Sequence, residues 1–161
     1  MRVAIITLSD SGYAGQREDK SGPVIRELAE AAGYEIVHTV LLPDGIEPLA
    51  SELRQLCDED MADLVLTTGG TGFSPTDLTP EATLSVVERP APGIAEAMRY
   101  NSLQITPRAM LSRAAAGIRK RTLIVNLPGS PKAVRECLEF ILPSLGHGLE
   151  ILRGTAGECA R

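Results

Sequence analysis

Short apolar runs alternate along this chain with longer segments in which apolar residues recur at helical spacing. Val3–Leu8, Asp63–Thr68 and Thr122–Leu127 are nearly continuous apolar runs of strand length. Glu35–Leu42 is rich in isoleucine and valine and alternates in part. Continuous runs of this kind are typical of strands buried on both faces of a parallel sheet. The pattern therefore predicts four strands.

Helical patterns occupy most of the chain between and after these strands, although residues 11–20 are polar and predict a loop. Helices are predicted over residues 21–33, 46–60, from 79 onward, over 93–116 with an interruption near 107, and over 132–152 with a bend near 143–148. Ser21 or Gly22 is the expected cap of the first helix and Thr79 that of the third.

Strands that alternate with helices predict an α/β fold, with a mostly parallel sheet between two layers of helices. The 161 residues suit a single domain over residues 1–161, because no linker, repeat or low-complexity tract divides them. Four turn signals follow the predicted strands directly, and ligands of such folds lie at the carboxyl ends of the strands. We therefore expect these turns to line one edge of the sheet.

Composition narrows the classes of function. The net charge is −5, and residues 99–121 carry six basic side chains and no acid within an otherwise acidic chain. Such a chain does not suit a general nucleic-acid binder, whereas the basic stretch suits either a compact anionic ligand or a solvated helix face. The three cysteines form no CxxC pair, no apolar run has membrane length, and we expect no signal peptide. We expect a cytoplasmic protein without a membrane partner.

The strongest local signal is a glycine-rich turn after the third strand. Gly69, Gly70 and Gly72 surround Thr71, and Asp77 follows shortly after. Glycines permit close backbone approach, and their N–H groups can converge on a phosphate near a helix start. The spacing matches neither a dinucleotide fingerprint nor a P-loop. Phosphate or nucleotide binding is one interpretation of this turn, and a tight structural turn is the other.

Two carboxylates lie in or near the predicted turns. Asp77 follows the glycine-rich turn, and Asp44 stands in a Pro-Asp-Gly turn after the second strand. A carboxylate beside a phosphate would repel it unless a cation intervened, and Mg²⁺ bound by one or two carboxylates plus phosphate oxygens resolves this conflict. Aspartate is also ordinary in a turn, so a structural role for Asp44 remains open.

A second turn, Asn126-Leu127-Pro128-Gly129-Ser130-Pro131, leads from the last strand into the last helix. Gly129 gives access to the backbone, and Ser130 can bind a ligand or cap the helix. Lys132 near the helix start opposes the helix dipole, which a nearby anion would explain. The turn alone does not distinguish binding from capping.

Together these segments resemble a known family. Thr68-Gly69-Gly70-Thr71-Gly72, Asp77, Thr79-Pro80-Glu81-Ala82-Thr83 and Asn126 to Pro131 occur in the order found in the stand-alone molybdopterin-binding proteins of molybdenum cofactor synthesis. Leu8-Ser9-Asp10-Ser11, Glu18 to Pro23 and Leu111-Ser112-Arg113-Ala114 are similar to theirs as well. The resemblance covers nearly the whole chain.

The resemblance implies a molybdopterin adenylyltransferase, in which the terminal phosphate of molybdopterin attacks the α-phosphorus of ATP and pyrophosphate leaves. It also implies a homotrimer and possible hand-over of the product to a molybdenum-inserting enzyme. The catalytic and Mg²⁺-binding positions of the family fall on Asp44 and Asp77. Its molybdopterin- and nucleotide-binding positions fall on Ser9, Asp10, Ser21, Gly22, Gly69, Gly70, Thr71, Gly72, Thr79, Glu81, Arg113, Asn126, Pro128, Gly129, Ser130 and Pro131.

Three alternatives remain at this point. A binding module would hold molybdopterin or a nucleotide without making product, although two carboxylates near phosphates would not favour binding alone. A nucleotide pyrophosphatase could use the same domain, but such proteins usually have a longer chain than 161 residues. A purely structural trimer-forming protein would not need the glycine-rich turns.

Overall fold

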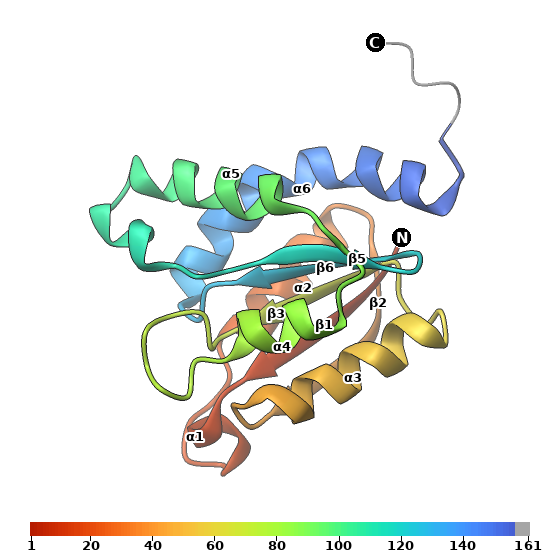
Figure 1. Ribbon diagram of the computed structural model, residues 1–161. Helices are drawn as coiled ribbons and strands as arrows, with labels where there is room; N and C mark the ends of the chain where they lie inside the picture. Colours follow the sequence, from red (N-terminus) through yellow and green to blue (C-terminus); the bar gives the residue numbers. More distant parts are fainter. Residues whose placement is uncertain (157–161) are drawn as a thin grey trace.

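The computed structural model describes residues 1–156, which form an α/β fold with a six-stranded sheet between two layers of helices (Figure 1). The strands are β1 (Arg2–Leu8), β2 (Glu35–Leu42), β3 (Leu64–Thr68), β4 (Arg89–Pro90), β5 (Ala116–Arg119) and β6 (Thr122–Leu127). The helices are α1 (Asp10–Tyr13), α2 (Ser21–Ala31), α3 (Ile46–Asp58), α4 (Thr79–Val86), α5 (Pro92–Leu103), the 3-10 helix η1 (Pro107–Leu111) and α6 (Pro131–Arg153).

The sheet has the order β2-β1-β3-β6-β5-β4. The four strands predicted from sequence, β2, β1, β3 and β6, pair in parallel, whereas β5 pairs antiparallel with both β6 and β4. The carboxyl ends of the four parallel strands therefore meet at one edge. The prediction of a mostly parallel sheet with helices on both faces is confirmed.

Alternate residues of the central strands supply two separate cores. Val3, Ile5 and Leu66 pack with α2, α5 and α6 on one face of the sheet. Ala4 and Ile6 pack with α3 and α4 on the other face, as the period-2 geometry of a strand requires. Burial on both faces explains why the strands are nearly continuous apolar runs.

The segment from residue 93 to 116 agrees with its prediction as far as Leu111, with an interruption just before Pro107, and differs after that residue. The expected helix ends at Leu103, η1 follows after a short turn, and Ala116–Arg119 forms strand β5. The alanine-rich sequence favours a helix locally, but pairing with β6 overrides this preference. Gly117 is required there, because a Cβ would lie 2.4 Å from the side chain of Val87.

Three smaller predictions were also wrong. The polar segment after β1 contains the one-turn helix α1, and Lys20, not Ser21 or Gly22, is the N-cap of α2. Thr79 is not the cap of α4, because Leu78 takes that position and the Thr79 hydroxyl donates instead to the carbonyl of Gly69 at 2.8 Å.

The cysteines and the lengths of the helices agree with the composition. Cys57 and Cys137 are buried free thiols, and Cys159 lies outside the described residues. Within residues 1–156, no helix is long and apolar enough to cross a membrane.

Candidate active site

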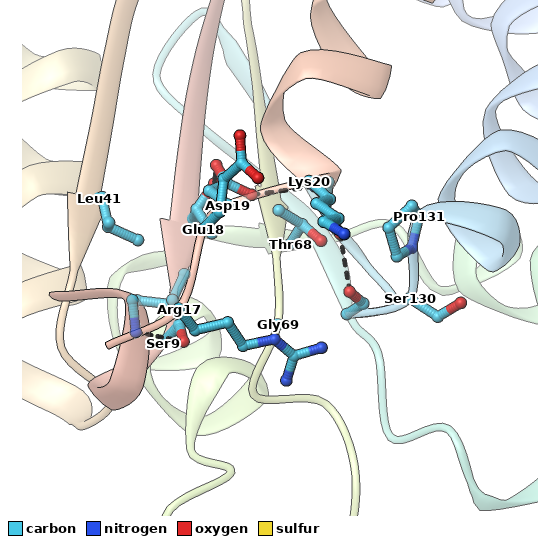
Figure 2. A pocket seen from close by; sticks show the side chains of 15 residues that line it. Ser9, Arg17, Glu18, Asp19, Lys20, Leu41, Thr68, Gly69, Ser130 and Pro131 are labelled. Carbon is cyan, nitrogen blue, oxygen red and sulfur yellow. Dashed lines mark hydrogen bonds between the residues drawn. The ribbon is translucent and has the colours of Figure 1, made fainter. Parts of the chain in front are cut away.

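A cavity with a volume of about 410 Å³ lies at the carboxyl ends of the parallel strands (Figure 2). Ser9 follows β1, Gly69 follows β3, and the 129–131 turn follows β6, so three of the four predicted turns line it. Its lining consists of Thr7, Leu8, Ser9, Gly12, Arg17, Glu18, Asp19, Lys20, Ser21, Leu41, Thr68, Gly69, Gly129, Ser130 and Pro131. The topology therefore brings together residues that are up to 124 positions apart.

The glycine-rich turn after β3 has a backbone that only glycine can adopt. Gly69 has φ +95°, and a Cβ there would lie 2.3 Å from the carbonyl oxygen of Leu8. Gly70 has φ +66°, and its Cβ would lie 2.3 Å from the hydroxyl oxygen of Thr79. The Thr79 N–H donates to the carbonyl of Gly70 at 3.1 Å, which ties the turn to the first residue of α4. The positive φ angles and the contacts to Leu8 and Thr79 therefore require glycine at both positions.

Asp44 lies against this turn, beside Asp10. The Asp44 N–H donates to Asp10 Oδ1 at 2.9 Å, and the Asp10 N–H donates to Asp44 Oδ2 at 3.0 Å. A Cβ on Gly70 would lie 3.4 Å from Asp44 Oδ1, which places that carboxylate next to the glycines. Burial is the main reason why the pKa of Asp44 is raised, and the charges of Asp10 and Asp77 raise it further against the Asp10 N–H bond.

Asp77 reaches the same place from the other side of the turn. Its Oδ2 accepts from the Ser74 N–H at 2.8 Å and lies 2.9 Å from where a Cβ of Gly72 would stand. Its charge contributes to the raised pKa of Asp44, so the two carboxylates interact. No group of three His, Cys, Asp or Glu side chains within residues 1–156 could hold a metal alone. A divalent cation between Asp44 and Asp77 would thus need oxygens from substrate or water, as Mg²⁺ commonly does.

The start of α2 is occupied by a side chain of the protein. Asp19 Oδ1 accepts from the N–H groups of Ser21 and Gly22 at 2.9 and 3.0 Å, and Asp19 Oδ2 accepts from the Thr7 hydroxyl at 2.7 Å. The Ser21 hydroxyl donates to the carbonyl of Gly129 at 2.7 Å. Ser21 and Gly22, both predicted to bind ligand, therefore join the cavity wall to β1 and to the 129–131 turn.

Arg17 and Lys20 are cavity residues that the sequence reasoning missed. Both belong to the loop between α1 and α2, and they are the basic residues of the cavity lining. Figure 2 shows the guanidinium of Arg17 extending toward Gly69. The available signal was the position of this loop directly after a strand that ends at the ligand edge.

Three other predicted residues lie behind the glycine-rich turn. Asn126 is fully buried, and its side-chain amide donates to the hydroxyls of Thr67 and Thr83 at 3.0 and 2.8 Å. Arg113 and Glu81 pair with each other, which raises the pKa of Arg113 and lowers that of Glu81. These three side chains are occupied by protein partners.

The 128–131 turn separates the main cavity from a smaller one of about 210 Å³. Pro128 lines the smaller cavity, together with Arg99 of α5 and Ser112, whereas Gly129 and Ser130 line the larger. Ser130 also caps α6, because its side chain accepts from the Ala133 N–H at 3.4 Å. The capping interpretation of Ser130 is therefore confirmed, and its place in the cavity wall is established as well.

Comparison with known proteins agrees with this geometry. Residues 4–147 match the family described as "Probable molybdopterin binding domain". The chain is 40% identical over 156 residues to the molybdopterin adenylyltransferase of Helicobacter pylori J99, and the aligned region covers 96% of this chain and 89% of that protein. It is 41% identical over 150 residues to the molybdopterin adenylyltransferase of Escherichia coli K12, and the aligned region covers 91% of this chain and 76% of that protein. The molybdopterin biosynthesis enzyme MoaB of Thermus thermophilus is 48% identical and superposes with a TM-score of 0.90 over 95% of this chain and 96% of that one. The match runs from β1 into α6 and contains all four ligand-edge turns, so the chain belongs to the molybdopterin-binding domain family.

Proposed function

We propose that this protein is a molybdopterin adenylyltransferase of molybdenum cofactor biosynthesis. The observation that carries the proposal is the placement of Asp44 and Asp77 around the glycine-rich turn, at the ligand edge of the sheet. Two interacting carboxylates beside a backbone cradle suit a phosphate ligand only together with a cation. Sequence identity of about 40% to proteins with this activity supports the same assignment.

The reaction joins two phosphates. An oxygen of the terminal phosphate of molybdopterin attacks the α-phosphorus of ATP, a new P–O bond forms, and the bond to the departing pyrophosphate oxygen breaks. The attacking phosphate is already ionised at neutral pH, so no side chain has to remove a proton. Such a transfer depends on positioning and on neutralisation of charge. The absence of histidine from the lining of the larger cavity is consistent with this chemistry.

The residues of the site divide this work. Asp44 and Asp77 would hold Mg²⁺, which supplies charge neutralisation between the carboxylates and the phosphate oxygens. The backbone of Gly69 to Gly72 and the 128–131 turn would position phosphate groups, and Arg17 and Lys20 would attract the anionic substrates into the cavity. A homotrimer in the cytoplasm, with hand-over of the adenylylated product to a molybdenum-inserting enzyme, completes the proposal.

The test is incubation of the purified protein with molybdopterin, ATP and Mg²⁺, followed by mass spectrometry of the products. Adenylylated molybdopterin should form and should disappear without Mg²⁺. Asp77→Asn should lower turnover roughly 10²–10³-fold, the usual loss when one preorganised electrostatic group is removed. Asp58→Asn is the matched control, because Asp58 ends α3 and pairs with Arg119 at the opposite edge of the sheet.

Each outcome has a distinct meaning. Wild-type turnover in Asp77→Asn would reject the catalytic role of this carboxylate. Tight binding of molybdopterin without any product would favour the binding module. Hydrolysis of a nucleotide without transfer would favour the pyrophosphatase. Light scattering on the same preparation tests the trimer separately.

A further inference from the structure

Arg113 makes four contacts to the segment that carries the glycine-rich turn and Asp77. Its Nε donates to the carbonyl of Gly72 at 2.8 Å, and its Nη2 donates to the carbonyl of Asp77 at 2.5 Å. Its backbone N–H donates to the carbonyl of Thr71 at 2.9 Å. The fourth contact is an ion pair with Glu81, in the first turn of α4. One residue of the η1–β5 connection thus binds the segment that carries Asp77, one of the two candidate metal-binding carboxylates.

The two side-chain bonds to backbone have a mechanical consequence. Gly72 and Asp77 flank the exposed segment 73–76, and a single planar guanidinium binds the carbonyls of both flanking residues. Within this segment the Asp77 N–H donates to the Ser74 carbonyl at 2.9 Å, and the Asp77 carboxylate accepts from the Ser74 N–H. The position of the Asp77 carboxylate therefore depends on the closed shape of the loop.

The charge of Arg113 is already compensated. Glu81 takes bonds from both terminal nitrogens of the guanidinium, one of them at 3.3 Å. With the bonds to Gly72 and Asp77, four of the five N–H groups have protein acceptors. An arginine in this state has little to offer a phosphate, but its rigid fork suits the fixing of several oxygens at once.

We propose that Arg113, oriented by Glu81, is a positioning residue that closes the 72–77 loop and so places the Asp77 carboxylate for the transfer reaction. The inference rests on the proposed function for its catalytic part. Its mechanical part concerns the protein alone, and it differs from the direct ligand binding expected from sequence.

Arg113→Lys is the main variant, because lysine keeps the charge and cannot bind three acceptors with one plane. Glu81→Gln is a milder second variant that keeps an acceptor oxygen. Arg119→Lys is the matched control: Arg119 likewise binds a carboxylate with two nitrogens, at 2.9 and 2.8 Å from Asp58, and a backbone carbonyl, that of Val86, at 3.0 Å. It lies at the opposite edge of the sheet, where β5 turns into β6.

Two readouts separate positioning from binding. Hydrogen exchange of the Ser74 and Asp77 amides, measured without substrate, should become about tenfold faster or more in Arg113→Lys, as for loss of a charge-assisted hydrogen bond. It should stay unchanged in Arg119→Lys. In the transferase assay, kcat should fall about tenfold or more in Arg113→Lys with KM for molybdopterin within about twofold of wild type. Glu81→Gln should shift both readouts in the same direction by less.

The proposal is overturned if the two amides exchange at the wild-type rate in Arg113→Lys, or if KM rises while kcat stays constant. The second result would make Arg113 a ligand contact. If the wild-type protein makes no product, the proposed function fails, but the exchange rates still decide whether Arg113 closes the loop.

Discussion

Asn126→Leu should cost much of the stability of this protein, although Asn126 belongs to a motif associated with ligand binding. The side chain is fully buried below the site. Its Oδ1 accepts from the Ala115 N–H at 3.1 Å, and its Nδ2 donates to the hydroxyls of Thr67 and Thr83. Leucine has the same branched shape, with two methyl groups in place of the amide oxygen and nitrogen, and can make none of these bonds. The substitution therefore removes the polar contacts without opening a large cavity.

The magnitude follows from the groups left behind. Three hydrogen bonds contribute about 1 kcal/mol each, and an N–H group left without a partner in a buried position costs about 1–3 kcal/mol. The two threonine hydroxyls can rotate toward other acceptors, which reduces the total. We expect a loss of about 2–4 kcal/mol in the free energy of unfolding, a large part of the 5–15 kcal/mol typical of a domain.

Urea unfolding followed by circular dichroism measures this loss. Asn101→Leu is the matched control, since Asn101 is the only other asparagine and lies partly exposed on α5. A loss below about 1 kcal/mol in Asn126→Leu would refute the reasoning.

Asn126→Asp tests the direction in which stability changes with pH. The introduced carboxyl is buried, so its pKa in the folded state lies above its value in the unfolded state. The stability of this variant should therefore be highest at acid pH and fall as the pH rises through the pKa of the folded state.

Three further predictions concern single positions. Gly70→Val should abolish phosphate binding and lower the melting temperature by several degrees, because φ +66° and the contact to Thr79 both exclude a Cβ; unchanged nucleotide affinity by calorimetry would contradict this. Burial raises the pKa of Asp44, so protons should compete with Mg²⁺ for this carboxylate at a higher pH than for an ordinary aspartate. The Mg²⁺ concentration that gives the half-maximal rate should therefore rise as the pH falls toward the pKa of Asp44. Asp63→Asn should cost about 1–3 kcal/mol near pH 7. Burial alone would raise the pKa of Asp63, but the hydrogen bonds from Arg2 outweigh it and lower this pKa. The difference in stability between Asp63→Asn and wild type should therefore vanish as the pH falls through the pKa of Asp63 in the folded state. A difference that stays constant in acid would count against the ion pair.

The sheet and the position of its ligand edge could be predicted from sequence because they depend on local signals. A strand buried on both faces is a continuous apolar run, and Val3–Leu8 and Asp63–Thr68 show this without any tertiary information. Parallel strands require crossovers, so their carboxyl ends meet at one edge whatever the details of the helices. The turns that follow β1, β3 and β6 had to lie together.

The errors fall where a contact distant in sequence decides the structure. Ala114 to Ala116 favours a helix locally, yet it leads into a strand because β6 offers a partner and the Asn126 side chain accepts from the Ala115 N–H. Thr79 has the composition of a helix cap, yet its hydroxyl serves Gly69, ten residues earlier. Neither partner can be identified from the neighbouring sequence.

Contacts between residues distant in sequence also decide which motif residues are available to a ligand and which ones build the walls of the site. The family resemblance implies ligand binding by motif residues such as Ser21, Arg113 and Asn126. The structure gives each of them protein partners: Ser21 binds the Gly129 carbonyl, Arg113 the 72–77 loop, and Asn126 two threonines and a backbone N–H. Co-occurrence in a motif therefore marks residues that build the site as well as residues that touch the ligand.

Because many polar groups of the site are hydrogen-bonded within the protein, few of them remain available to a ligand. The groups that remain can bind a cation or attract phosphate. The Asp44 and Asp77 carboxylates each accept one backbone N–H, so oxygen lone pairs remain for a cation. Arg17 and Lys20 supply positive charge in the cavity wall, which also contains Glu18 and the hydrogen-bonded Asp19. A cation bound by these two carboxylates beside the glycine-rich turn, together with the two basic side chains of the cavity wall, would neutralise the negative charges that two phosphate substrates bring together. That balance, more than any single residue, is why the site suits transfer between phosphates.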